Sequence, residues 1–236
     1  MAKALKSDAV KGLFCLETHT WGGPKSHASI EPTLQLLDRY WDVPSEARYV
    51  HHSVATGDEL LYCLQEYCDP ESGFDTHPIL ILSFHGFSGD KGKAPGIHVG
   101  SGEEVDLDTI AECMERRCEN RIVYFSSCGT MKVDKRRLHT FLKKTEALAV
   151  CGYEQSVAWV ASAAFEVMFL GLLQSDFDWE DFEKHGEDYE PDDYRYGHDF
   201  TLHGMRGLAD SIEHFAPKLR DRLGFRMVLR ESKAKK

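Results

Sequence analysis

Two short apolar runs, each ending on a reactive side chain followed by glycine, constrain the fold of this chain most strongly. The first is Ile79–Gly86 (ILILSFHG) and the second is Arg121–Gly129 (RIVYFSSCG). Their β-branched and aromatic residues predict buried strands. In an open α/β sheet, ligands bind outside the carboxyl ends of the strands. We therefore expect His85 and Cys128 to share one cleft.

The rest of the chain alternates between predicted strands and predicted helices. We expect strands at residues 11–17, 48–55, 79–85, 121–128, 147–153 and 225–229. We expect helices at residues 29–43, 59–67, 108–117, 134–145, 157–173 and 201–219, with Ser29 and Asp108 as N-caps and Pro44 ending the first. A glycine-rich loop follows His85, and short extended pieces near residues 97–99 and 104–107 predict a hairpin. The alternation predicts an α/β fold with a mainly parallel central sheet and helices on both faces.

Length and composition favour a single domain over residues 1–236. The chain is 42% hydrophobic, enough for one sizeable core, and it shows no internal repeat or linker. A net charge of −11 argues against general nucleic-acid binding, which uses clustered lysine and arginine. The apolar segment 157–173 is interrupted by Ser162 and Glu166 and is shorter than the roughly 20 residues that a bilayer requires, so we expect no membrane partner.

The seven cysteines predict a reduced, cytoplasmic protein. Their number is odd, and residues 1–10 lack the continuous apolar stretch of a secretory leader. Most of these thiols are expected to be small buried hydrophobes. Neither the pair at residues 51–52 nor Cys113 with Cys118 has the spacing of a zinc site, and the glycines match no nucleotide-binding motif. We therefore expect no metal and no cofactor.

His85 and Cys128 have the chemistry of a nucleophile and its base. A cysteine attacks as the thiolate, and a neighbouring histidine can take its proton. The backbone N–H groups of Gly86 and Cys128 are candidates to hold a developing oxyanion. Taken singly, each residue is equally typical of an ordinary strand end. The pairing of two adjacent strand ends, each followed by glycine, favours a functional site.

Three further residues are candidates for substrate binding. Asp90, in the loop after His85, could attract a basic side chain, although a turn residue there is commonplace. Tyr153 ends the next predicted strand, Trp159 follows that strand, and both could form a wall of the cleft. Trp159 also stands at helical spacing from Phe165 and Phe169, which is typical of a core stripe.

The segment at about 175–200 is strongly acidic, with carboxylates and aromatic residues interleaved between residues 176 and 193. Such a run predicts a solvated surface loop; the alternative is a border of the cleft that helps to select substrate. Residues 230–236 predict a frayed basic tail.

The motifs Ser83–Gly86 (SFHG) and Ser126–Gly129 (SSCG), with the order of elements over residues 12–173, resemble the caspase-like cysteine peptidases. This superfamily includes caspases, metacaspases, gingipain-type and CHAT-type proteases, and the likeness is nearest to small prokaryotic members. There, His-Gly ends the third strand and the nucleophilic cysteine ends the fourth. The resemblance implies a caspase-like three-layer sandwich, His85 as general base and acid, Cys128 as the nucleophile that forms an acyl-enzyme, and a protein or peptide substrate.

The resemblance stops short of a substrate preference. Residues 127–130 (SCGT) do not match the longer pattern of eukaryotic caspases, so a preference for cleavage after aspartate is not carried over. Small bacterial relatives of this fold act in defence or cell death, which implies gating by an activating ligand or partner protein. The alternative is a non-catalytic binding or regulatory module that holds a peptide or small ligand at the strand-end cleft.

Overall fold

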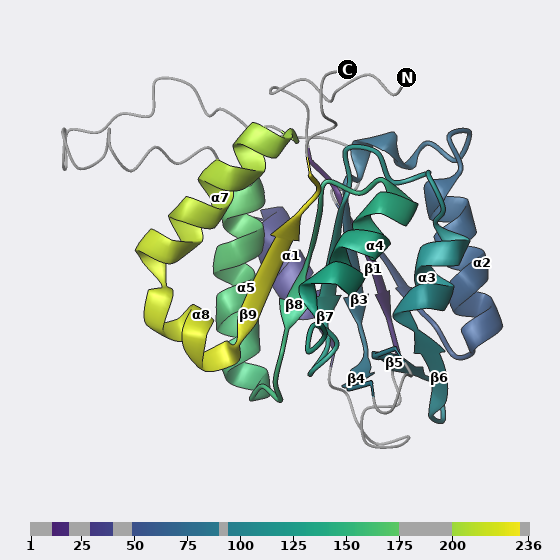
Figure 1. Ribbon diagram of the computed structural model, residues 1–236, viewed down its shortest axis with the longest axis horizontal. Helices are drawn as coiled ribbons and strands as arrows, with labels where there is room; N and C mark the ends of the chain where they lie inside the picture. The colour runs from purple at the N-terminus through teal and green to yellow at the C-terminus, as the bar shows by residue number, and fades with distance from the viewer. Residues whose placement is uncertain (1–10, 19–28, 40–48, 90–93, 175–199, 232–236) are drawn as a thin grey trace.

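The computed structural model describes residues 11–18, 29–39, 49–89, 94–174 and 200–231 (Figure 1). Six strands of the described residues form one sheet in the order β2-β1-β3-β7-β8-β9. The first five are parallel, and β9 runs antiparallel to β8. Their bounds are β1 Leu13–Glu17, β2 Tyr49–Ser53, β3 Ile79–Ser83, β7 Ile122–Ser126, β8 Ala149–Tyr153 and β9 Phe225–Leu229.

Helices cover both faces of this sheet (Figure 1). One face carries α2 (Gly57–Cys68), α3 (Leu107–Cys113) and α4 (Lys135–Thr145), which pack in a row. The other carries α5 (Trp159–Gln174), which contacts α1 (Glu31–Arg39), α7 (Leu202–Phe215) and α8 (Pro217–Leu223). The predicted α/β fold with a mainly parallel sheet between two helical layers is confirmed.

Strand residues alternate between the two layers because successive side chains of a strand point to opposite faces. In β1, Leu13 and Cys15 join the core beneath α1 and α5, whereas Phe14 and Leu16 join the core beneath α2 and α3. The strand is buried on both sides, as a central parallel strand must be. Its apolar run therefore extends up to Glu17, which leaves a charge at the carboxyl end.

The segment after β3 differs from the predicted loop. His85–Phe87 form a short strand, β4, which pairs with β5 (Gly96–Val99), and β5 pairs with β6 (Glu103–Asp106). The hairpin predicted near residues 97–107 is therefore present, but it belongs to a three-stranded antiparallel sheet. The loop prediction was wrong at Gly86 and Phe87 because their backbone groups find partners about ten residues further along the chain. His85 was predicted to end the strand that begins at Ile79, but that strand ends at Ser83 and His85 begins β4.

Two helix boundaries also differ from the predictions. The N-cap of helix α3 lies two residues earlier than predicted, because Asp106 rather than Asp108 accepts the Thr109 N–H, at 2.8 Å. The helix predicted over residues 201–219 is divided between α7 and α8. Ala216 has non-helical dihedral angles because Pro217 follows it, and proline disfavours the helical conformation in the residue before it.

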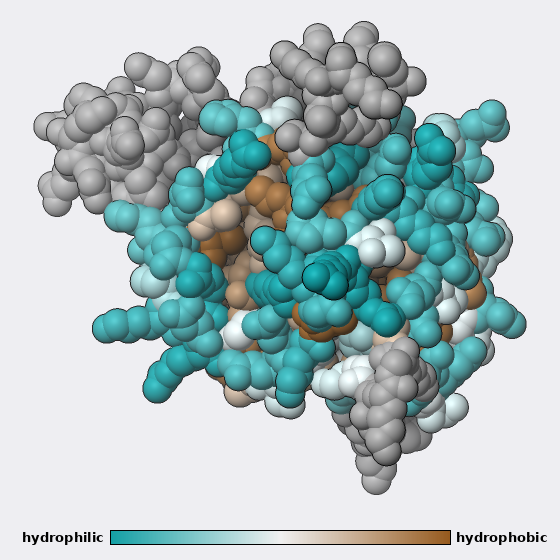
Figure 2. All heavy atoms as spheres, viewed as in Figure 1, coloured by the Kyte–Doolittle hydropathy of each residue, from teal (hydrophilic) through white to brown (hydrophobic). Residues whose placement is uncertain are grey.

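The face in Figure 2 is mostly hydrophilic, with apolar residues showing in the gap between α7 and α4, over β9 and α5. None of the helices in the described ranges combines the length and apolar character that crossing a membrane requires.

Candidate active site

The pairing of β3 with β7 brings His85 and Cys128 to the same edge of the sheet. The two strands are adjacent and parallel, and Ser83 lies opposite Ser126. His85 and Cys128 each follow those partners by two residues. Both therefore leave the sheet at the same level, at the carboxyl ends of neighbouring strands.

Gly86 packs directly against the backbone of Cys128. A Cβ added at Gly86 would lie 2.0 Å from the Cys128 carbonyl oxygen and 2.6 Å from Thr130 Oγ1. Thr130 is itself held, since its hydroxyl hydrogen-bonds Ser127 Oγ at 2.7 Å and donates to the Gly96 carbonyl at 3.2 Å. Only glycine permits so close an approach. The His-Gly turn and the cysteine loop are thus in contact.

Cys128 is half-buried in the turn that follows β7. Its Sγ accepts the Val157 N–H at 3.4 Å, which points the positive end of a peptide dipole at the sulfur. Gly129 then turns the chain with a φ of +70°, in the left-handed region that favours glycine. All seven cysteines carry free thiols.

His85 is exposed and faces a second histidine across the antiparallel ladder. Its Cα partner is His98, whose ring lies 5.1 Å from the ring of Phe87 and whose Nδ1 is buried without a partner in the described part of the chain. Partial desolvation, followed by repulsion from His98, lowers the pKa of His85. The imidazole is therefore neutral near neutral pH, the form that can accept a proton.

A buried carboxylate lies beneath the cysteine strand. Glu166, on α5, is 4% exposed, and three hydroxyls converge on its Oε1: Tyr124 at 2.8 Å, Ser126 at 2.5 Å and Tyr153 at 3.4 Å. Burial raises the pKa of Glu166 even though these hydrogen bonds oppose the shift. Ser126, two residues before Cys128, links this cluster to the edge of the sheet.

A second buried carboxylate ends β1. Glu17 accepts hydrogen bonds from Ser29 Oγ at 2.6 Å, the Ile30 N–H at 2.9 Å and His51 Nε2 at 2.9 Å. Burial would raise the pKa of Glu17, but these hydrogen bonds outweigh it and the pKa is lowered. Glu17 thereby fixes the segment that enters α1 to the end of the sheet.

A cavity of about 270 Å³ lies between the entrance to α1 and the first turns of α5, and we name it the α1/α5 cavity. Trp159, in its wall, follows two residues after Val157, whose N–H donates to Cys128 Sγ. Its lining residues are Ser29, Ile30, Pro32, Thr33, Trp159, Ser162, Ala163 and Glu166.

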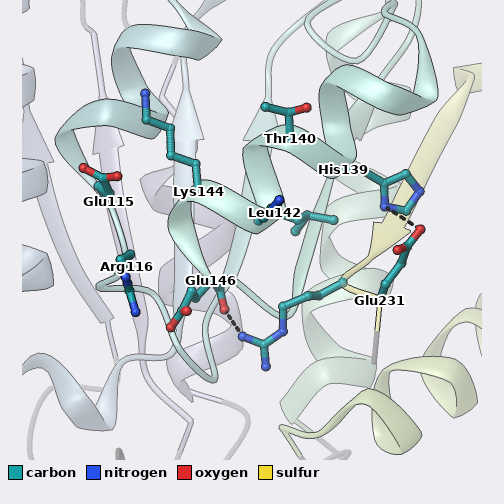
Figure 3. Close-up of a pocket in the computed structure, with 10 residues that line it drawn as sticks. Glu115, Arg116, His139, Thr140, Leu142, Lys144, Glu146 and Glu231 are labelled. Atoms are coloured by element: carbon teal, nitrogen blue, oxygen red, sulfur yellow. Dashed lines mark hydrogen bonds and ion pairs between the residues drawn. The ribbon is translucent and has the colours of Figure 1, made fainter. Parts of the chain in front are cut away.

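A larger pocket of about 860 Å³ lies at the opposite, amino-terminal edge of the strands (Figure 3). Arg116 N–H donates to the Lys144 carbonyl there, just before β8 begins, and Arg230 donates to the Glu146 carbonyl. Charges of both signs line it, and it is remote from the strand ends that carry His85 and Cys128.

The other candidate residues have different positions. Tyr153 is 1% exposed, so it does not form the surface of the candidate site; its hydroxyl donates to Glu166 Oε1 instead. Phe165 and Phe169 are core residues as their spacing predicts, whereas Trp159 is 43% exposed and lines the cavity. The core interpretation of Trp159 was therefore wrong. Asp90 and the acidic segment 176–193 lie outside the described residues.

Sequence reasoning missed Glu166 and Glu17 as members of the site. Glu166 was noted only as an interruption of an apolar segment, yet a lone carboxylate in a buried helix is itself a signal, because a buried charge requires partners. Glu17 gave a similar signal, as a charge ending an apolar strand. Across the described residues, no group of three or more His, Cys, Asp or Glu side chains is placed to hold a metal ion.

Comparisons with known proteins give a family and a structural likeness. No curated protein matches the sequence. Among solved structures, the Drosophila initiator caspase Dronc is similar with a TM-score of 0.48 and 12% sequence identity, over 77% of this chain and 73% of that one. The model of a family of unknown function, DUF6642, matches residues 10–189, and the chain belongs to that family.

Proposed function

We propose that this protein is a cysteine endopeptidase in which Cys128 is the nucleophile and His85 is the general base and acid. The observation that carries the proposal is the register of β3 and β7, with Ser83 opposite Ser126, together with the contact of Gly86 on the Cys128 carbonyl. Adjacent strand ends of a parallel sheet are the usual place for chemistry in this class of fold.

The lowered pKa of His85 keeps its imidazole neutral, so in the first proposed step it acts as the base. A neutral imidazole takes the proton of the Cys128 thiol, and the thiolate attacks the carbonyl carbon of a peptide bond. The N–H groups of Gly86 and Cys128 are the proposed donors to the resulting oxyanion. The imidazolium then returns the proton to the departing amine, which leaves a thioester on Cys128. Water, deprotonated by His85, hydrolyses the thioester and regenerates the thiol.

The test combines labelling with cleavage. An electrophilic cysteine probe should modify Cys128 faster than Cys63, which is also half-buried but lies on α2. Replacing either member of the dyad, Cys128→Ala or His85→Ala, should abolish cleavage of a denatured protein substrate, whereas Cys63→Ala should cleave like the parent. Equal cleavage by Cys128→Ala would refute the proposal.

The experiment also separates the alternatives. Fast labelling of Cys128 without cleavage would indicate a peptidase that waits for an activating ligand or partner protein. Slow labelling, unaffected by His85→Ala, would favour a non-catalytic binding module at the same edge.

A further inference from the structure

A pair of buried cysteines lies outside the candidate active site and takes part in none of its proposed steps. Cys68 is the last residue of α2, and Cys118 lies in the segment between α3 and β7. Their sulfur atoms are 3.6 Å apart, and the two residues are 2% and 0% exposed. Their chain neighbours Asp69 and Arg117 are exposed, so each thiol lies one residue away from the surface.

The two sulfur atoms are close enough for a disulfide to form with little movement. A disulfide bond is about 2 Å long, so the sulfur atoms need to approach each other by about 1.5 Å. Cys68 ends its helix, and Cys118 belongs to neither a helix nor a strand, so a shift of this size need not break a run of backbone hydrogen bonds. The bond would join the end of α2 to the segment that leads into β7.

A buried arginine gives this pair a positive environment. Arg121 is 6% exposed, and its guanidinium donates to the Tyr67 carbonyl at 2.6 Å and lies over the Tyr67 ring, 4.3 Å from the centroid. Among the described residues, the carboxylate paired with Arg121 is that of Asp75, at 3.5 Å, and the Asp75 side chain is 78% exposed. A buried cation whose counter-charge is solvated favours a second anion close by, and the residue that follows Tyr67 is Cys68.

The pKa shifts of the two thiols have opposite directions. A hydrogen bond from Cys118, followed by the charge of Arg121, lowers the pKa of Cys68 although burial opposes the shift. The same hydrogen bond, together with burial, raises the pKa of Cys118. Because the thiolate is the form of cysteine that reacts with oxidants, Cys68 is the reactive member of the pair and Cys118 the resolving one.

We propose that Cys68 and Cys118 form a redox site, at which a hydroperoxide converts the two thiols into a reversible disulfide. With hydrogen peroxide, the Cys68 thiolate attacks one oxygen and the O–O bond breaks. Cys68 becomes a sulfenic acid, and the other oxygen leaves as hydroxide and takes up a proton to form water. The sulfur of Cys118 then attacks the sulfur of Cys68, the S–O bond breaks, and the hydroxyl group leaves with the Cys118 proton as a second water. The two sulfur atoms together lose two electrons, which the peroxide gains, and a dithiol reverses the reaction by exchange.

Peptide mapping of the peroxide-treated protein tests this site directly. The reduced protein is treated with a small molar excess of hydrogen peroxide, remaining thiols are alkylated, and the unreduced tryptic peptides are identified by mass spectrometry. Trypsin cleaves at the arginines between Cys113 and Cys118, so these two cysteines are on separate peptides. We expect the Cys118 peptide to be linked to the peptide that carries Cys68, and dithiothreitol should remove the link.

Single substitutions assign the reactive member. Cys118→Ser should leave Cys68 as a sulfenic acid that dimedone traps, whereas Cys68→Ser should give no dimedone adduct on Cys118. Two half-buried cysteines supply matched controls: Cys63 shares the tryptic peptide of Cys68, and the Cys113 thiol donates to the Leu61 carbonyl of α2. Cys63→Ser and Cys113→Ser should both form the link as the parent does.

The disulfide should also change the thermal stability. It closes a loop of 50 residues and so restricts the unfolded chain. Oxidation should therefore raise the midpoint of thermal unfolding by at least about 5 °C in the parent and in Cys113→Ser, but not in Cys118→Ser.

Two results would overturn the assignment. The first is a link from Cys68 to Cys113, and the second is a treated parent in which Cys68 and Cys118 are both still alkylated while Cys128 is oxidised. The map of the parent decides between these results and the expected one even if a serine variant folds poorly. Because no readout involves peptide cleavage, the outcome is independent of the proposed peptidase activity.

Discussion

Replacing Gly86 by alanine is the sharpest test of how the His-Gly turn meets the cysteine loop. The new Cβ would lie 2.0 Å from the Cys128 carbonyl oxygen, far inside the 3.4 Å at which ordinary contact begins. The atom it meets is backbone, so no rotamer change relieves the overlap. Gly86 is held by pairing with Ile97, and Cys128 follows a central strand. Strain in a well-packed environment of this kind costs about 1–3 kcal/mol.

The overlap can be relieved in only two ways, and each has its own readout. If the turn stays in place, urea denaturation should show the free energy of unfolding reduced by that amount with an unchanged m-value. If the turn moves away instead, His85 moves with it. A shift of about 1 Å at reacting groups can lower kcat/KM about 100-fold, while stability then changes little. Both quantities should be measured on the same preparation.

Gly171→Ala is the matched control. This glycine is in α5, and a Cβ there would meet no atom of the described residues within 4 Å. Since alanine is a better helix former, the variant should gain up to about 1 kcal/mol and keep the activity of the parent. The reasoning fails if Gly86→Ala matches the parent in both stability and kcat/KM.

Two further predictions concern pH. Because the pKa of His85 is lowered, its neutral form should persist at pH values below the ordinary histidine pKa, and the acid limb of the kcat/KM profile should lie below that pKa. His98→Gln should shift this limb to higher pH without restoring the ordinary histidine pKa, since desolvation is the larger cause of the lowering. An acid limb at or above that ordinary value would contradict the proposed role of His85. The pKa of Glu17 is lowered in the folded protein, so this carboxylate stabilises the fold at pH values above its pKa in the unfolded chain, and the contribution is lost as pH falls. Glu17→Gln should therefore lower the free energy of unfolding by about 1–3 kcal/mol near neutral pH and by progressively less in acid. Chemical denaturation over a pH series measures this difference. A cost that does not vary with pH would mean that the charge of Glu17 is not what His51 and Ser29 stabilise.

The sequence predicts the strands and helices that position this candidate site because these elements depend on local sequence signals. Runs such as Ile79–Ser83 specify strands by composition, and Thr56 and Asp134 cap their helices through side-chain bonds three residues ahead. The order of such elements then leaves few ways to arrange a parallel sheet. The division at Pro217 was also a local signal, because a proline in a helical pattern marks a boundary.

What the sequence could not predict depends on contacts between distant segments. Strand β4 exists only because residues 96–98 come alongside it, and no pattern in His85–Phe87 announces that pairing. Glu166 likewise draws its hydroxyls from β7 and β8. Hydrophobic periodicity finds the core face of a helix but does not report which polar group on that face will meet which strand.

The two buried carboxylates at the carboxyl edge of the sheet, Glu17 and Glu166, have opposite pKa shifts because their hydrogen-bond donors differ. Glu17 receives donors on both oxygens, among them a backbone N–H and His51, so its charge is satisfied by the fold. Within the described ranges, Glu166 receives hydroxyl donors alone, all on one oxygen, and burial raises its pKa. A buried carboxylate whose oxygens are both hydrogen-bonded by the protein contributes to the stability of the fold. Substitution of Glu17 should therefore lower the free energy of unfolding near neutral pH.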